Sequence, residues 1–316
     1  MKSALQVIQE CISTQNQALD LYDCGITNDS AEIHLLKECK HITSLDLRCN
    51  NLYKIEGLDR LTQLGTLFLG NNQIQKIEGL EKLKKLNHLE FFNNKIKKIE
   101  GLGSLSGLKI LNLQNNEIDK IEGLGQLRLL ESLHLSNNQI QKIENLQRLQ
   151  RLSDLQLSGN QIDNIEGLDH LKSLESLSLS NNQIQKIEKL EALTNLTTID
   201  IQYNKIDRII GLDRLRSLEF LLLSNNNIQK IEGLKNLKAL SSLYLSGNQI
   251  QKIEGLDNLQ KLNYLDMDHN KISKIEGLDN LTNLDTLLLR GVPIENIEAI
   301  DPILERGRTF RFKHTY

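Results

Sequence analysis

The chain contains 316 residues with a formal net charge of −3, and 39% of its residues are hydrophobic. Only 4% are aromatic and tryptophan is absent, so the core must be built from leucine and isoleucine. The near-neutral charge gives no overall argument for binding to nucleic acid or to an anionic membrane. No run approaches the roughly 18 consecutive apolar residues that indicate a transmembrane helix.

The first segment, residues 1–18, is expected to form a capping helix. Its sequence MKSALQVIQECIST places Ala4, Leu5, Ile8, Cys11 and Ile12 on one helical face. Polar residues interrupt the apolar run that a secretory signal needs. All 4 cysteines lie within the first 50 residues. We therefore expect reduced thiols and a cytoplasmic protein, and the alternative is a disulfide-bonded N-terminal cap.

Residues 19–300 are expected to form one repetitive domain. Each unit contains an L-x-L segment, then an asparagine, an isoleucine five residues later and usually Glu-Gly-Leu. The asparagines recur at intervals of 22 residues: Asn50, Asn72, Asn94, Asn116, Asn138, Asn160, Asn182, Asn204, Asn226, Asn248 and Asn270. The unit LxxLxLxxNxIxKIEGLxxL resembles the leucine-rich repeat.

The spacing within the unit predicts the fold class. Leucines that alternate along a segment indicate a short strand, and stacked units join such strands into a parallel sheet over a continuous core. We predict an α/β solenoid, a leucine-rich repeat horseshoe with a parallel concave β-sheet, about 13 coils and short helical or irregular convex segments. The recurring asparagine should bond backbone groups of its own and adjacent coils.

Two further features of the repeat concern its surface and its end. A basic residue four positions after the asparagine and a glutamate two positions later form columns that should pair with one another. Residues 301–316 are expected to form a C-terminal cap strand. Phe310 and Phe312 alternate there with basic residues, and charges on an edge strand discourage further pairing.

Candidate partner-binding residues occupy the variable positions that flank the L-x-L leucines, on the expected concave face. Aromatic side chains beside carboxylates are typical of the centres of protein interfaces. The N-terminal cluster comprises Phe68, His88, Glu90 and Phe92. The C-terminal cluster comprises Tyr203, Phe220, Leu222, Tyr244, Tyr264, Asp266 and Asp268. We expect a protein partner to contact both clusters or the second alone; the alternative is that these aromatic side chains have no partner.

Other chemistry is not indicated by the sequence. No nucleophile motif such as G-x-S-x-G occurs, so we expect no enzymatic activity and no catalytic residue. The spacing of His34, Cys39, His41 and Cys49 matches no zinc pattern, and we predict neither a metal nor a cofactor. Carboxylates outnumber basic residues on the concave face, which disfavours nucleic acid. We expect a monomer that binds neither nucleic acid nor membrane.

Units such as NNQIQKIEGLEKLKKLNHLEF resemble the leucine-rich repeat class typified by the regulatory subunit of type-1 protein phosphatase, and bacterial intracellular leucine-rich repeat proteins share the pattern. The opening ALDLYDCGIT resembles bacterial repeat domains that precede Roco-type GTPase modules. The resemblance implies a non-enzymatic protein–protein interaction scaffold. One alternative is a regulatory subunit of a type-1-like phosphatase. Another is a secreted or surface recognition protein, because Asn28, Asn195 and Asn280 match glycosylation sequons.

Overall fold

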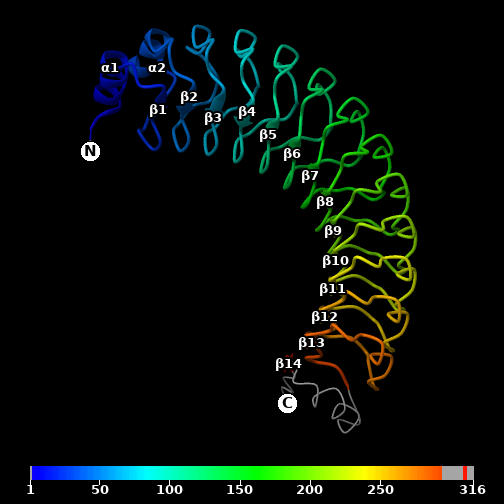
Figure 1. Ribbon diagram of the computed structural model, residues 1–316. Coiled ribbons are helices and arrows are strands. Elements are labelled where there is room, and N and C mark those ends of the chain that lie inside the picture. The colour runs from blue at the N-terminus through cyan, green and yellow to red at the C-terminus, as the bar shows by residue number, and fades with distance from the viewer. Residues whose placement is uncertain (1, 294–308, 312–316) are drawn as a thin grey trace. The chain divides into compact units, whose positions relative to one another are not determined.

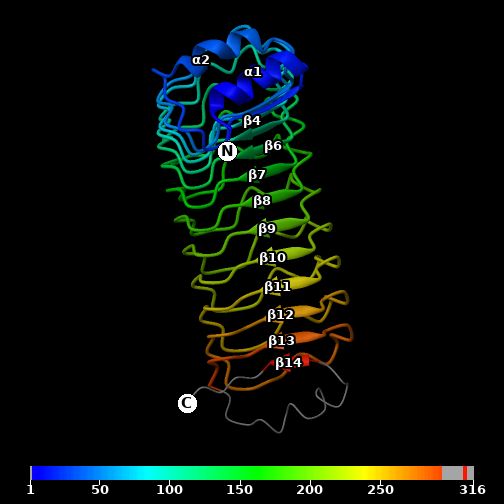
Figure 2. The ribbon, with the colours of Figure 1, turned by 90° about the vertical axis from the view of Figure 1, so that its left-hand side faces the viewer.

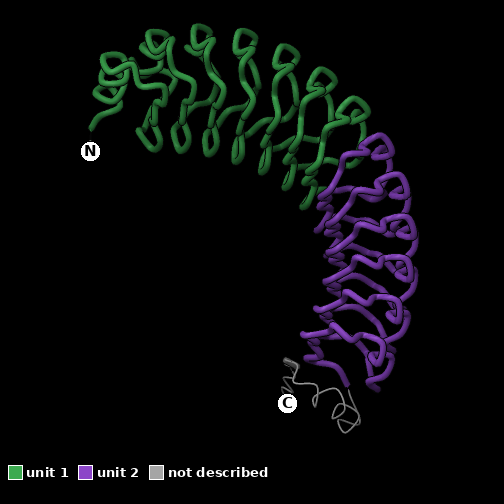
Figure 3. The backbone as a smooth tube through the Cα atoms, in the orientation of Figure 1, with its two compact units in different colours: residues 1–160 green, residues 161–316 purple. Residues whose placement is uncertain are grey.

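The computed structural model describes residues 2–293 and 309–311 (Figure 1). The chain forms two compact units, residues 1–160 and residues 161–316 (Figure 3). Each unit is a stack of coils in which successive coils contribute strands of three residues. Leucine and isoleucine at the repeat positions fill both cores, and Phe91 is the largest fully buried side chain among the described residues.

Unit 1 begins with helix α1 (Ala4–Thr14), whose buried residues include Ile8 and Cys11. Ser3 and Gln6 form a capping box at its start, in which each side chain accepts a hydrogen bond from the other's backbone N–H. The longer first coil carries helix α2 (Ala31–Leu35) and the 3-10 turn η1 (Leu36–Glu38). Seven strands pair in parallel in chain order: β1 (Ala18–Asp20), β2 (Ser44–Asp46), β3 (Thr66–Phe68), β4 (His88–Glu90), β5 (Ile110–Asn112), β6 (Ser132–His134) and β7 (Asp154–Gln156).

Unit 2 continues the same architecture, and Figure 2 shows its strands side by side. Its strands also pair in parallel in chain order: β8 (Ser176–Ser178), β9 (Thr198–Asp200), β10 (Phe220–Leu222), β11 (Ser242–Tyr244), β12 (Tyr264–Asp266), β13 (Thr286–Leu288) and β14 (Thr309–Arg311). The backbone of Phe310 lies in β14. The rest of the expected cap strand, Phe312 included, lies outside the described residues.

The predicted fold class is confirmed, since each unit is a parallel β solenoid with little helix. The central leucine or isoleucine of each of β1–β13 is buried as expected. The flanking residues are more exposed, except Ser178, Ser242 and Leu288, which are buried as well. Away from the strands, most coils have irregular outer segments rather than helices. No helix within residues 2–293 is long and apolar enough to span a membrane.

The recurring asparagine bonds backbone groups of two coils, as predicted. Asn116 accepts a hydrogen bond from the N–H of Ile96 at 3.0 Å. Its amide nitrogen donates to the carbonyl oxygens of Phe91 at 2.9 Å, Leu113 at 3.0 Å and Gln114 at 3.2 Å. The same pattern recurs at other coils of both units, so these asparagines satisfy backbone groups that the turn after each strand would otherwise leave unpaired.

The recurring glycine and the charged columns also serve the framework. Gly101 adopts φ +69°, and a Cβ there would collide with the carbonyl oxygen of Ile77 in the preceding coil. This left-handed conformation and close approach explain the glycine. On the outer surface, Lys76 lies 3.7 Å from Glu78 and 3.8 Å from Glu100, which confirms pairing within and between coils there. Exposed pairs of this kind contribute less than about 1 kcal/mol each.

Candidate functional site

The variable side chains that flank the central leucine or isoleucine of each of β1–β13 form one surface in each unit, which we call the strand face. Because parallel strands pair in register, residues at equivalent positions of neighbouring coils lie side by side about 4.8 Å apart. In unit 2, Phe220 pairs with Ser242 and Leu222 pairs with Tyr244. On the strand face, residues that occupy the same repeat position therefore form a row of neighbouring side chains.

The structure brings most of the C-terminal cluster together on β10, β11 and β12. Leu222, Tyr244 and Asp266 occupy one row across these three strands. The rings of Tyr244 and Tyr264 are tilted by 34° with centroids 4.8 Å apart. Phe220 is 40% exposed, which is high for a phenylalanine. The side chains of Phe220, Leu222, Tyr244 and Tyr264 therefore form an apolar and aromatic surface that is partly open to water in the isolated chain.

Tyr203 lies beside this surface, in the turn after β9. It is 55% exposed and has φ 53°, a left-handed conformation that is uncommon for aromatic residues. Asn181 and Asn225 hold the equivalent position in the neighbouring coils, with φ 55° and 58°. Cys49 and His269 hold the same repeat position with φ 57° and 53°, so this turn places several different side chains in the left-handed conformation.

The structure corrects the prediction for Asp268, which was expected to be open to a partner. Its side chain is buried, with 5% of the residue exposed. It accepts hydrogen bonds from the backbone N–H of Arg290 at 2.6 Å and from Nε of Arg290 at 2.7 Å. Asp268 therefore holds Arg290 in the turn that directly follows β13. Asp266 remains partly exposed, and burial raises the pKa of its carboxyl above the usual value.

The N-terminal cluster is also assembled on neighbouring strands, in unit 1. The ring of His88 meets the ring of Phe68 edge-on at 5.2 Å between centroids. Nε2 of His88 lies 2.8 Å from a carboxylate oxygen of Glu90. Phe92 packs over Gly70, where any Cβ would collide with its ring. All four predicted residues are thus half-buried and in contact with their surroundings.

The cluster in unit 1 extends further than the sequence pattern indicated. The guanidinium carbon of Arg48 lies 4.9 Å from the centroid of Phe68 and 5.8 Å from that of Tyr22. Nε of Arg48 donates to Asp46 at 3.0 Å. Tyr22 was missed because the first coil is 26 residues long. The signal was present, since Tyr22 precedes Cys24 by two residues as Arg48 precedes Asn50.

A serine, a histidine and an aspartate also meet on the strand face of unit 1, but not as a catalytic triad. Nε2 of His134 lies 2.9 Å from both Ser132 Oγ and Asp154 Oδ2. In a triad the two partners contact opposite ring nitrogens, so that the histidine can accept the serine proton while the aspartate orients it. Here Ser132 Oγ also donates directly to Asp154 at 3.1 Å. These hydrogen bonds link the neighbouring strands β6 and β7.

The thiols and histidines near the N-terminus form no metal centre. Within the part of the chain that the structure describes, no group of three or more His, Cys, Asp or Glu side chains is arranged to hold a metal ion. Cys11 Sγ lies 3.8 Å from Nε2 of His41 and hydrogen-bonds to Cys39. All four cysteines are free thiols. Burial raises the pKa of the Cys39 thiol to about 12.

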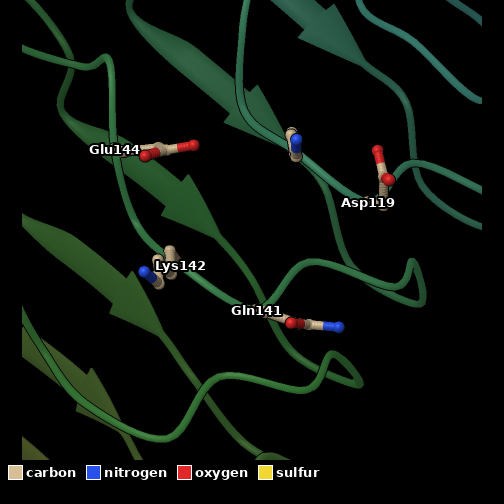
Figure 4. Close-up of a pocket in the computed structure, with 5 residues that line it drawn as sticks. Asp119, Gln141, Lys142 and Glu144 are labelled. Carbon is tan, nitrogen blue, oxygen red and sulfur yellow. The ribbon is translucent and has the colours of Figure 1, made fainter.

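Crevices on the flank of the coils are products of the repeat. One in unit 1 has a volume of about 330 Å³ and is lined by Asp119, Lys120, Gln141, Lys142 and Glu144. Figure 4 shows these side chains spread along the loops rather than converging on one point. The equivalent residues of unit 2 line a second crevice, Asp207, Arg208, Gln229, Lys230 and Glu232. A crevice that recurs at one repeat position, lined by solvated charges, does not indicate a ligand site.

Comparison with known families gives one match that spans most of the chain. The sequence profile described as Leucine Rich repeats (2 copies) matches residues 40–82, 62–104, 84–126, 128–170, 172–214 and 216–258. No curated protein sequence matches the chain.

Solved structures share the fold over the whole length of the chain. An internalin, InlF, from Listeria monocytogenes is 25% identical with a TM-score of 0.88, covering 99% of this chain and 95% of its own. The leucine-rich repeat protein LIC12759 from Leptospira interrogans is 22% identical with a TM-score of 0.75, covering 99% of both chains. The chain is thus similar to bacterial leucine-rich repeat proteins.

Two further structures of the same fold are complexes, one of Toll with Spätzle and one of TLR13 with an RNA. The Toll–Spätzle complex from Drosophila is 20% identical with a TM-score of 0.72, covering 93% of this chain and 44% of the other. A complex of TLR13 with ssRNA13 is 22% identical with a TM-score of 0.73, covering 95% and 50%. At these identities the likeness concerns the fold alone.

Proposed function

The chain belongs to the leucine-rich repeat family, whose members generally act as protein-interaction scaffolds, and we propose that it is a non-enzymatic scaffold that docks a protein partner on its strand face. The observation that carries the proposal is the group of aromatic and aliphatic side chains on β10, β11 and β12, of which Phe220 is exposed and the others are partly exposed. Phe220, Leu222, Tyr244 and Tyr264 lie on neighbouring strands of one unit. In the middle coils of the array, polar side chains such as Ser176 and Gln156 hold such positions.

The energetics of the repeat support this choice of surface. Framework positions are filled by the same residue in coil after coil, because each has the same packing or hydrogen-bonding task. Strand-face positions have no such task, and a large ring there remains partly in water. Covering it with a partner would recover about 25 cal/mol for each Å² of apolar surface removed from water. Aromatic anchors of this kind often dominate the affinity of protein interfaces.

The charge of the same surface supports a neutral to basic partner. Asp200 and Asp266 carry acidic groups on β9 and β12. Arg290 is engaged by Asp268 at 2.7 Å, so its charge is largely compensated. A face with this balance attracts basic proteins and repels phosphate groups. A protein partner is therefore favoured over nucleic acid, and the RNA bound by TLR13 remains a property of that protein.

The proposal is tested by capturing partners from the source cell with wild-type protein and with Phe220→Ala. A matched control, Thr198→Ala, alters the equivalent position on the neighbouring strand β9 without removing a ring. We expect a partner retained by wild type and the control and lost by Phe220→Ala, and then the same order with the purified partner. Retention of every partner by Phe220→Ala at unchanged affinity would contradict docking at this surface.

Two narrower alternatives make different predictions. A regulatory subunit would form a complex with a type-1 phosphatase and change its rate, and absence of both on direct addition would exclude that role. A secreted recognition protein would carry glycans or disulfides. Asn28 is buried, and its amide donates to Lys54 and Glu56, so that sequon is unsuitable for a glycan. We propose a cytoplasmic, monomeric protein, for which an intact mass with four free thiols is expected.

A further inference from the structure

Asp266 lies in an unusual setting on the strand face of unit 2. It pairs in register with Tyr244 on β11 and with the buried Leu288 on β13. The ring of Tyr264, two residues earlier on the same face, is in contact with that of Tyr244. The carboxylate therefore lies among two rings and an aliphatic side chain, where water solvates it poorly.

No cation of the described residues 2–293 forms a salt bridge with Asp266. The nearest guanidinium, that of Arg290, is held by Asp268 at 2.7 Å. Asp266 accepts hydrogen bonds from the backbone N–H of Asp268 at 3.1 Å and from the side chain of Ser246. Burial raises the pKa of its carboxyl, the charge of Asp268 adds to the rise, and the hydrogen bonds and the charge of Arg290 only partly oppose it.

Unit 1 contains a related arrangement in which the carboxylate has a guanidinium partner. Asp46 pairs in register with Phe68 on the following strand β3, whereas Asp266 pairs with Tyr244 on the preceding strand β11. Two residues after Asp46, Arg48 bonds that carboxylate and lies 4.9 Å from the centroid of Phe68. Two residues after Asp266 the chain instead has Asp268, which turns to Arg290. In unit 2 a carboxylate again has a ring on a neighbouring strand, but the coil that carries Asp266 supplies no guanidinium of its own.

We propose that Asp266, Tyr244 and Tyr264 form a recess for one arginine side chain of the docked partner, an inference that rests on the proposed scaffold function. A planar guanidinium can bond a carboxylate through two N–H groups while stacking on an aromatic ring. Arg48 makes both contacts within this chain. A lysine ammonium lacks the planar fork and would be held less well.

A direct test needs no identified partner. The probe is Nα-acetyl-arginine N-methylamide, and its neutral isostere, the citrulline compound, is the control ligand. Both are titrated into full-length protein with ¹³C-labelled tyrosine, whose ring signals are assigned with Tyr244→Phe and Tyr264→Phe. We expect the two ring signals to shift saturably with arginine, at millimolar concentrations, and not with citrulline. Asp266→Asn should weaken arginine binding by about tenfold or more.

The control variant is Asp200→Asn, which removes a carboxylate from the same repeat position on β9. It should leave arginine binding unchanged, and both Asn variants should fold, since each keeps the size of the side chain. Equal shifts with citrulline, equal affinity in Asp266→Asn, or no shift at all would overturn the proposal.

Partner binding separates this inference from the scaffold function. A partner that loses affinity in Phe220→Ala but not in Asp266→Asn would refute the arginine recess and leave the docking surface intact. A partner unaffected by Phe220→Ala would refute the docking surface itself. Loss in both variants, with Asp200→Asn unchanged, is the result that both proposals require.

Discussion

Replacing Asn116 by alanine should destabilise unit 1 far more than its size suggests. The amide makes four hydrogen bonds to buried backbone groups: it accepts from Ile96 N–H and donates to three carbonyl oxygens, at Phe91, Leu113 and Gln114. Alanine leaves one buried N–H without a partner, at about 1–3 kcal/mol, and removes the donor from the carbonyls. We expect a total loss of about 3 kcal/mol.

The adjacent residue supplies a matched control. Asn115 also makes amide hydrogen bonds, but only to the side chains of Asn93 and Asn137, and it has φ 55°. Glycine holds the equivalent position at Gly159, so Asn115→Gly removes those bonds while relieving the left-handed strain. Its free energy of unfolding should change by less than about 0.5 kcal/mol. Replacing Asn116 should therefore lower the free energy of unfolding several times more than replacing its neighbour Asn115.

The assay is urea denaturation followed by circular dichroism, with amide hydrogen exchange to locate the loss, since long repeat arrays can unfold in parts. Exchange should accelerate most at Ile96 in Asn116→Ala. A second variant, Asn116→Asp, keeps the acceptor for Ile96 but places a negative oxygen against three carbonyls, so it should be at least as unstable. Similar losses for Asn115→Gly and Asn116→Ala, or a stable Asn116→Asp, would refute this account of the repeat.

Three other outcomes follow from particular residues. Gly101→Ala should lower stability by about 2 kcal/mol or more in urea denaturation, because of its left-handed φ and the carbonyl it faces, whereas Gly103→Ala, with open space around it, should be neutral. The pKa of Asp154 is lowered, because hydrogen bonds from its histidine, glutamine and serine neighbours outweigh the opposite effect of burial. Asp154→Asn should therefore lower the free energy of unfolding by less than about 1 kcal/mol at neutral pH. In pH-dependent denaturation, the difference from wild type should shrink as the pH falls below about 4. Iodoacetamide should alkylate the half-exposed Cys49 well before the buried Cys39, whose pKa is raised to about 12, and equal rates in peptide mass mapping would contradict the burial.

The fold could be predicted because the same residue pattern recurs in almost every coil. A position such as Asn116 serves one hydrogen-bonding task, and that task recurs wherever the turn recurs. The period therefore gave the strands, their parallel order and the buried leucines together. The same logic accounts for the recurring glycine, although Asn145 and Lys189 adopt its left-handed conformation without being glycine, with φ 61°. Propensity alone would not have shown that this turn tolerates a Cβ at those coils.

The candidate site could be predicted only in part, because strand-face residues depend on their neighbours in space. Sequence reasoning placed Tyr244 and Tyr264 on adjacent strands correctly, since register follows from the period. It could not show that Asp268 would bury itself against Arg290, because that choice depends on side-chain torsions rather than on repeat position. It also missed Tyr22, whose place in the row beside Arg48 was hidden by the longer first coil.

The different roles of framework and strand-face positions explain which repeat positions vary in residue type from coil to coil. Replacing a framework residue affects two coils, because the recurring asparagine hydrogen-bonds backbone groups of its own coil and of the preceding one. On the strand face a substitution mainly changes the surface, except where a side chain such as Asp154 or Asp268 hydrogen-bonds a neighbouring coil. Tyr203 combines an exposed ring with a left-handed backbone that its asparagine neighbours adopt at lower cost. Cys49 and His269 hold the equivalent position in other coils with φ 57° and 53°, so the turn accepts side chains other than asparagine. The backbone of this turn therefore fixes the conformation at the position but leaves the choice of side chain open.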